Sequence, residues 1–288
     1  MIRARLADHL ESLLSADPRC RVGEGADAEE SVHDARVAIR RLRSDLRTFG
    51  PALEPGWAKP LRAEMAWWSD QLGEVRDAEV LFHVVETHTK RLDVRHRRAA
   101  DALLRVLAER GALRHTEVLG ILDGERFARL LERLAEASRA PRVDLVAGEL
   151  PARELVPELV ARSWKSLRRA VAAAGRPPTP AELHRIRIIA KRTRYAAETA
   201  AIVGPSGYRR LGRRLAALQD HLGDHHDAVQ AQAWLAGEAI RAVDREWTFV
   251  AGVLAGMLRD DELRLADSWR AVWQRAARAA AALDLRVD

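Results

Sequence analysis

Two stretches of the sequence gather basic side chains at the spacing of one helix face. In the first, residues 32–47 (VHDARVAIRRLRSDLR), a rotation of about 100° per residue places one histidine and four arginines on an arc of about 80°. These residues are His33, Arg36, Arg40, Arg43 and Arg47. The flat guanidinium fork binds phosphate oxygens bidentately, and an imidazole near a helix start can donate a hydrogen bond to an anion. The stretch therefore predicts a binding surface for a polyanion.

The pattern recurs in residues 183–198 (LHRIRIIAKRTRYAAE) at a shift of 151 positions. Glu198 stands where Arg47 stands in the first stretch, so the second basic face is a turn shorter. We interpret the match as an internal repeat. We call the five residues above stripe 1, and we call their aligned counterparts stripe 2, which consists of His184, Arg187, Lys191 and Arg194.

Like charges about 5–6 Å apart along a helix destabilise it when nothing neutralises them. A stripe that contains no acidic residue therefore suggests an anionic partner. A linear phosphate chain suits repeated arginines, and its binding should weaken steeply with salt. The alternative is a solvated face on which arginine stems cover apolar neighbours, but the repeat favours a ligand. Further basic residues are secondary phosphate-binding candidates; they are Arg41, Arg62, Arg192, Arg210, Arg213 and Arg214.

A rival site lies in residues 220–227 (DHLGDHHD). His221 and His225 are one helical turn apart, and His226-Asp227 is similar to the His-Asp pair of metal-dependent phosphohydrolases. The aligned segment of the first half, EVRD, carries no such ligand set, so we predict neither a metal nor a cofactor. A nonspecific nucleic-acid-binding bundle is a second alternative, although the tryptophans do not alternate with the stripe cations as stacking platforms would.

The composition predicts an all-α protein with a substantial core. The 288 residues are 48% hydrophobic, few are Gly or Pro, and no alternating β-branched runs indicate a sheet. The single cysteine excludes a disulfide framework. We see neither a signal peptide nor a membrane span, so we expect a soluble cytoplasmic protein. The residues expected to face the core beside the stripes are Ala35, Ile39, Leu42 and Leu46, and Ile186, Ala190, Thr193 and Ala197.

Breakers divide the chain into similar series of helices. We predict helices over 2–16 and from about 27 to 49, separated by a polar loop with Gly23 and Gly25. A third helix is expected to end at Gly73 and a fourth to begin at 74–77, and Gly223 marks the same break between helices 208–223 and 224–241. The segment 141–151 is the predicted junction between lobes of residues 1–143 and 151–288.

Two linked motifs carry a resemblance to a known family. Each H-x2-R-x3-[RK]-R-x-R stripe is followed by an LG-x2-[RH]-D-A segment, 72–78 in the first half and 222–228 in the second. The chain thus resembles a stand-alone member of the CHAD family, the conserved histidine α-helical domain. The resemblance implies two four-helix lobes related by a pseudo-two-fold axis, with the stripes facing a basic groove or pore that binds inorganic polyphosphate. His226 departs from the motif by replacing the arginine found at Arg76.

The resulting hypothesis is a single domain over residues 1–288 that binds inorganic polyphosphate without enzymatic activity. Stripes 1 and 2 are the predicted binding residues. We expect an association with polyphosphate granules in the cytoplasm and no membrane partner, and we favour polyphosphate over nucleic acid. The metal-dependent phosphohydrolase and the nucleic-acid-binding bundle remain the alternatives.

Overall fold

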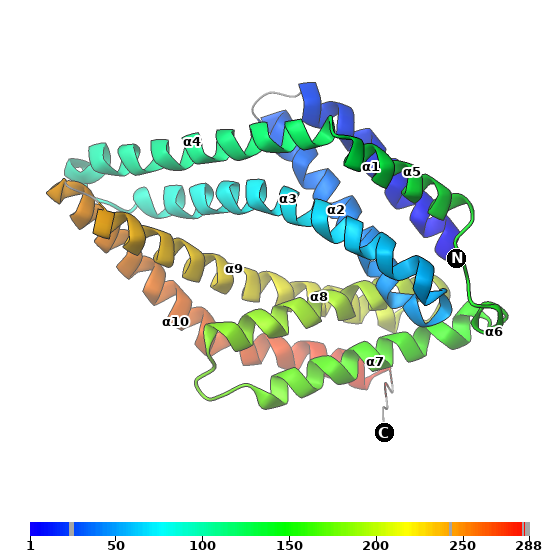
Figure 1. Ribbon diagram of the computed structural model, residues 1–288. Coiled ribbons are helices and arrows are strands. Elements are labelled where there is room, and N and C mark those ends of the chain that lie inside the picture. The colour runs from blue at the N-terminus through cyan, green and yellow to red at the C-terminus, as the bar shows by residue number, and fades with distance from the viewer. Residues whose placement is uncertain (23–25, 242–243, 284, 286–288) are drawn as a thin grey trace. The chain divides into compact units, whose positions relative to one another are not determined.

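The computed structural model describes residues 1–22, 26–241, 244–283 and 285, and the predicted glycine loop at 23–25 lies outside these residues. The described residues form helices and no strand, which confirms the all-α class (Figure 1). No helix among them is both long enough and apolar enough to cross a membrane. The helices are α1 (Ile2–Val22), α2 (Ala26–Thr48), α3 (Pro55–Thr89), α4 (Arg97–Leu122), α5 (Glu125–Arg139), α6 (Leu145–Gly148), α7 (Ala152–Ala173), α8 (Pro180–Val203), α9 (Gly207–Arg241) and α10 (Arg245–Ala281), with short 3-10 turns η1 (Gly50–Ala52) and η2 (Val94–His96).

The chain forms two compact units, and each unit draws on segments from both sequence halves. Unit 1 contains Met1–Arg76, Leu113–Val160 and Tyr195–Gly204, and unit 2 contains Asp77–Ala112, Ala161–Arg194 and Pro205–Asp288. Stripe 1 therefore lies in unit 1 and stripe 2 in unit 2. The lobes of residues 1–143 and 151–288, the pseudo-two-fold axis and the shared groove stay predictions.

In unit 1, the apolar face of α2 that lies beside stripe 1 is buried. Ala35, Ile39, Leu42 and Leu46 are all buried, as their spacing predicts. Helix α1 packs against both α2 and α5. Asp45, only 1% exposed, joins α1 to α2 because both of its oxygens accept from the Arg5 guanidinium at 2.9 Å. Such a buried carboxylate needs its partners to offset the cost of leaving water.

The stripe 2 helix, α8, begins at a capping box. The Thr179 backbone N–H donates to the Glu182 carboxylate at 2.7 Å, and the Glu182 N–H donates back to the Thr179 hydroxyl at 3.3 Å. The backbone and hydroxyl hydrogen bonds from Thr179 lower the pKa of the Glu182 carboxyl. Along the helix, the predicted inward face is confirmed, since its members are at most 1% exposed; they are Ile186, Ala190, Thr193 and Ala197.

Three predicted helix boundaries are wrong. Helix α3 runs unbroken through Gly73, and α9 runs unbroken through Gly223. A glycine inside a helix costs only about 1 kcal/mol, which the buried apolar face on both sides of each glycine outweighs. Helix α1 likewise continues past Pro18, although its predicted end was before Asp17-Pro18.

Candidate anion-binding site

Arg36 of stripe 1 lies against the backbone of α3 in unit 1. Its Nη1 donates to the Leu72 carbonyl oxygen at 2.6 Å. A Cβ atom placed on Gly73 would lie 3.8 Å from the same nitrogen, so the guanidinium is in contact with this glycine. The Leu-Gly pair of the second motif therefore provides the surface that positions the first arginine of the stripe.

Arg187 of stripe 2 makes the corresponding contact with α9 in unit 2. A Cβ atom placed on Gly223 would lie 3.6 Å from Arg187 Nε and 3.8 Å from its Nη2. The aligned pairs Arg36–Gly73 and Arg187–Gly223 thus share one kind of contact, each within its own unit. This contact depends on helices that continue through their glycines, because the guanidinium covers an unbroken helix surface.

Three nitrogen atoms of the stripe side chains are buried and make no hydrogen bond with the described residues. They are Nε of Arg40, Nε of Arg187 and Nδ1 of His184. Arg40 also places its guanidinium carbon 5.9 Å from the centre of the Tyr195 ring, a weak cation–π contact within unit 1. A desolvated donor without an acceptor costs about 1–3 kcal/mol, so these stripes would gain from an added acceptor.

The histidine of stripe 1 is surrounded by positive charge. Partial burial lowers the pKa of His33, and the charges of Arg76, Arg40 and Arg36 lower it further, against the opposite effect of Asp34. His33 is the first residue of the basic stripe, and we expected it near a helix start, but it lies seven residues after Ala26, two turns into α2. Because the helix dipole acts mainly over the first turn, His33 gains little from it.

The histidine of stripe 2 packs against a second imidazole. The rings of His184 and His226 are 4.4 Å apart and inclined by 38°. Burial, and then the charge of Arg187, lowers the pKa of His184. The pKa of His226 falls to about 4, because of burial first and then the charges of His184, Arg187 and His225. His226 is therefore neutral near pH 7.

From the sequence, we considered His226 as a departure from the motif and as part of the rival metal site, but the structure places it beside the stripe 2 histidine. Arg76 acts on the stripe 1 histidine through its charge, and His226, which aligns with Arg76, contacts the stripe 2 histidine through its ring. In each unit the residue before the motif aspartate is thus a neighbour of the stripe histidine. The alignment of Arg76 with His226 is the sequence feature from which this role could have been predicted.

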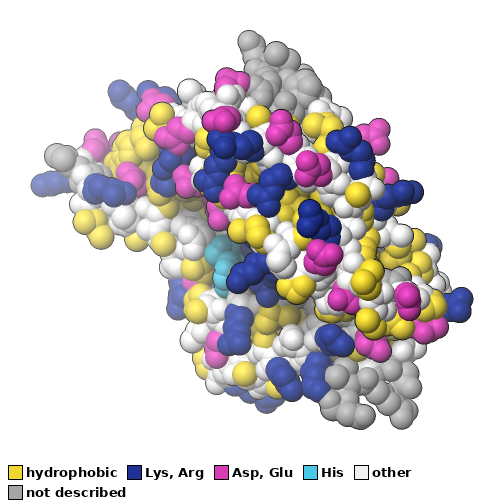
Figure 2. All heavy atoms as spheres, turned by 45° about the vertical axis from the view of Figure 1, so that its right-hand side comes forward, with side chains coloured by type: hydrophobic (Ala, Val, Ile, Leu, Met, Phe, Trp, Pro, Cys, Tyr) yellow, Lys and Arg dark blue, Asp and Glu magenta, His cyan; other side chains and the backbone are white. Residues whose placement is uncertain are grey.

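The remaining candidates are half-buried or exposed. Arg43, Arg47, Lys191 and Arg194 are half-buried, and Nη1 of Arg194 donates to the Gln219 side chain at 3.3 Å. Arg62 is half-buried, and the other secondary candidates are exposed, namely Arg41, Arg192, Arg210, Arg213 and Arg214. The face drawn in Figure 2 also mixes Lys and Arg with Asp and Glu, so bulk charge alone does not mark a binding surface. The binding role of every stripe residue stays a prediction.

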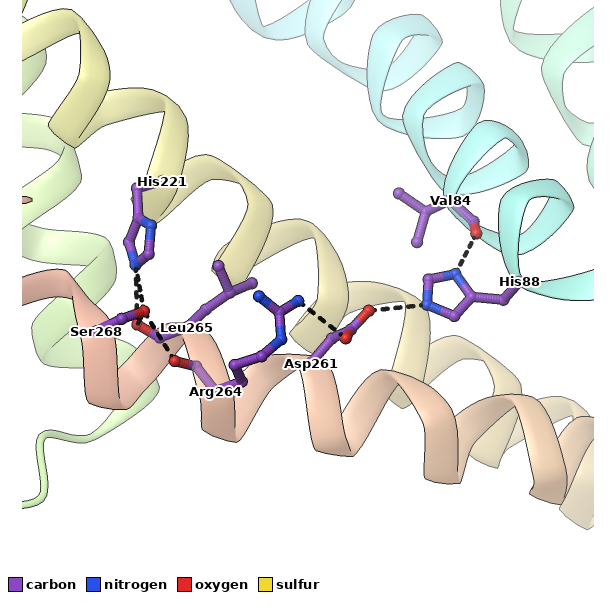
Figure 3. Close-up of polar contacts among 7 residues, drawn as sticks. All are labelled: Val84, His88, His221, Asp261, Arg264, Leu265 and Ser268. Carbon is purple, nitrogen blue, oxygen red and sulfur yellow. Dashed lines mark hydrogen bonds and ion pairs between the residues drawn. The ribbon is translucent and has the colours of Figure 1, made fainter. Parts of the chain in front are cut away.

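The histidines of the rival segment have separate neighbours within unit 2. His221 Nε2 lies 2.9 Å from the Leu265 carbonyl oxygen and 3.4 Å from the Ser268 hydroxyl, both on α10 (Figure 3). His225 is buried, and its pKa is lowered by burial first. His226 packs against His184. Within the described part of the chain, no group of three or more His, Cys, Asp or Glu side chains could hold a metal ion.

Sequence reasoning missed a buried histidine between α3 and α10. His88 Nδ1 lies 2.7 Å from the Val84 carbonyl oxygen, and its Nε2 lies 3.0 Å from Oδ2 of Asp261 (Figure 3). A carbonyl and a carboxylate only accept, so both hydrogen bonds form together when the imidazole carries two protons. Arg264 donates to the other oxygen of Asp261 at 3.0 Å. No sequence motif signals the contact between His88 and Asp261, because these two residues are 173 positions apart along the chain.

Comparison with known proteins identifies the family. Residues 4–236 match the CHAD domain, and the chain belongs to this family. Two solved structures share its fold: PptA from Streptomyces chartreusis, with a TM-score of 0.79 at 22% identity over 95% of this chain and 98% of that one, and the CHAD domain from the plant Ricinus communis, with a TM-score of 0.74 at 23% identity over 96% and 90%.

A curated relative extends beyond the matched region. The chain is 32% identical over 279 residues to the uncharacterized protein Rv2226 of Mycobacterium tuberculosis. The match covers 88% of this chain and 48% of the relative, so the chain spans about half the length of the curated protein that it matches.

Proposed function

We propose that this protein binds inorganic polyphosphate through stripes 1 and 2 and does not turn it over. The observation that carries the proposal is that each stripe holds a guanidinium with a buried Nε that makes no hydrogen bond with the described residues, in Arg40 and in Arg187. Membership of the CHAD family supports the same ligand, because the motif resemblance implies polyphosphate binding.

The chemistry of the stripes suits a repeating phosphate chain. Cations three and four residues apart on a helix lie about 5–6 Å from one another, so neighbouring cations can engage successive parts of a flexible anion. A small rotation of Arg40 or Arg187 on binding would bring Nε to a phosphate oxygen and recover the bond that it lacks. Charge-assisted bonds of this kind are about twice as strong as neutral ones.

Charge reversal in both stripes tests the proposal. We expect the full chain carrying Arg40→Glu and Lys191→Glu to lose retention of defined-length polyphosphate while its helicity, measured by circular dichroism, is unchanged. The matched control carries Arg98→Glu and Arg105→Glu, which make the same charge change at exposed positions of α4. Equal retention by the folded stripe variant and the control would refute the proposal.

A salt series and single variants refine the same test. Affinity for polyphosphate should fall linearly with the logarithm of salt concentration, because binding releases counterions. Arg40→Glu alone and Lys191→Glu alone should each reduce the steepness of this dependence if both stripes contact the ligand. A single variant that keeps the wild-type slope would remove its stripe from the binding surface.

The alternatives are decided in the same preparations. Long-chain polyphosphate should displace single-stranded nucleic acid at far lower phosphate concentration than the reverse; the opposite order would favour a nucleic-acid-binding protein. Phosphate release from polyphosphate that requires a divalent metal and is lost in His225→Ala would favour a phosphohydrolase. The separate contacts of His221 and His226 do not support a shared metal site.

The cellular part of the proposal is an association with polyphosphate granules in the cytoplasm. We expect a fluorescently tagged chain to form foci that coincide with polyphosphate staining. The variant with Arg40→Glu and Lys191→Glu should be diffuse at the same expression level. Foci that persist in cells lacking polyphosphate would contradict this part.

A further inference from the structure

A pocket of about 420 Å³ lies in unit 1 between the first turns of α3 and the C-terminal end of α5. Its size falls within the range of small-molecule sites, about 300–1,000 Å³. Trp57 and Leu61 of α3 form an aromatic and apolar wall. The opposite side is charged and is formed by Arg133, Glu136, Arg139 and Arg142. We call this site the Trp57 pocket.

The Trp57 pocket is on a different side of α3 from the stripe contact. Gly73, which touches stripe 1, comes sixteen residues after Trp57 and is rotated by about 160° around the helix axis. Leu61 comes one turn after Trp57 and faces the same way as it. A ligand in the Trp57 pocket is therefore not simply an extension of a chain bound along stripe 1.

The backbone around the Trp57 pocket is fixed by a short antiparallel pairing. The Glu54 N–H donates to the Arg142 carbonyl oxygen at 3.1 Å, and the Asp144 N–H donates to the Ala52 carbonyl oxygen at 3.0 Å. An isolated bridge between Leu53 and Val143 lies between these bonds. The segment that carries Arg142 is thus tied to the segment that leads into α3, and Arg142 is held at the rim.

Three of the four charged side chains in the Trp57 pocket have no short-range polar partner, although Arg126, through its hydrogen bond, and then the charge of Arg133 lower the pKa of the Glu64 carboxyl. The side chains of Arg133, Glu136 and Arg142 form no hydrogen bond or ion pair with any described residue. Arg139 donates from Nε to the Ala135 carbonyl oxygen at 3.1 Å, which fixes its stem along α5. Three guanidinium groups and one carboxylate give the Trp57 pocket a net positive charge beside the indole ring of Trp57.

We propose that the Trp57 pocket binds a nucleoside phosphate. The indole of Trp57 offers a face on which a flat base can stack. The guanidinium groups of Arg133 and Arg142 can bind the phosphate oxygens, and the Glu136 carboxylate can accept from an exocyclic amine or a ribose hydroxyl. An inorganic phosphate chain would use only the arginines, so the aromatic wall and the carboxylate are what select a nucleotide.

Calorimetric titration of the full chain with ATP tests the proposal. The chain carries Arg40→Glu and Lys191→Glu, so that phosphate binding to the stripes is suppressed. No stripe residue lines the Trp57 pocket, so a failure of ATP binding can be distinguished from a failure of polyphosphate binding to the stripes. We expect one ATP per chain, with adenosine and inorganic tripolyphosphate each binding at least about tenfold more weakly. Tripolyphosphate binding as tightly as ATP, or an absence of ATP binding, would overturn the proposal.

Variants locate the site. Trp57→Ala and Arg142→Gln should each weaken ATP binding by about tenfold or more, through the lost stacking and the lost charged bond respectively. Arg129→Gln, an exposed position of α5 outside the pocket, should bind ATP normally. Arg142 is itself exposed, so its variant decides the question even if Trp57→Ala does not fold. ATP affinity that is unchanged in folded Arg142→Gln would overturn the assignment.

Discussion

Lowering the pH should tighten polyphosphate binding through the two stripe histidines. In the protein without ligand, the pKa of His33 and that of His184 both lie below 6.5, because burial and the neighbouring arginines disfavour the charged ring. A bound polyanion brings negative charge to the same place and raises both pKa values. Protonation is then linked to binding, and the complex takes up protons that the unliganded protein lacks.

The magnitude follows from the number of rings that titrate. At pH values between the pKa of a histidine in the free protein and its pKa in the complex, that histidine increases the affinity by up to about tenfold for each unit by which the pH falls. His33 and His184 together therefore give at most about a hundredfold per unit. His226, with a pKa of about 4, stays neutral from pH 8 to pH 6 and adds nothing. Above the pKa values of the complex, the dependence should vanish.

The assay is equilibrium binding of one polyphosphate length between pH 6 and 8 at constant ionic strength. In the variant with His33→Gln and His184→Gln, affinity should depend much less on pH. The polyphosphate titrates in the same way with both proteins, so its own titration cancels in the comparison. His83→Gln, a change at an exposed histidine of α3, should keep the wild-type profile. A wild-type affinity that does not change with pH, or an undiminished slope in the double variant, would refute the reasoning.

Three further predictions concern stability and the stripe contact. Arg5→Ala leaves the buried Asp45 carboxylate without its bidentate partner and should reduce the free energy of unfolding in urea by about 3 kcal/mol; an unchanged midpoint would contradict this. Burial would raise the pKa of Asp261, but hydrogen bonds to its carboxylate outweigh that effect and lower the pKa below 3.8. Asp261→Asn should therefore lower the melting temperature near pH 7, and this difference from the wild type should disappear as the pH falls through the lowered pKa of Asp261. A difference that persists at lower pH would show that the charge of the carboxylate is not what stabilises the fold. Gly223→Ala should keep polyphosphate affinity, because its Cβ would be in ordinary contact with Arg187, whereas Gly223→Leu should displace that side chain and reduce affinity; equal binding by both variants would exclude a positioning role for the contact.

The sequence by itself determined the helical class and which face of each stripe helix is buried. Apolar residues recur at the period of an α-helix, and this period is local, so it fixes the inward arc before any partner is known. Ile39 and Leu42 of α2 and Ile186 of α8 are buried for this reason. The two linked motifs were also sufficient to indicate the family, because a motif is read along the chain.

Only the tertiary structure decided what each basic residue touches. Arg36 binds the carbonyl of Leu72, 36 residues away, and His226 packs on His184, so these contacts depend on how helices pack and not on local spacing. Packing also explains why the helices continue through Gly73 and Gly223. The small cost of a glycine in a helix is outweighed by the burial of apolar side chains on both sides of it. Local periodicity specifies faces, whereas the partners of those faces follow from the free energy of the whole fold.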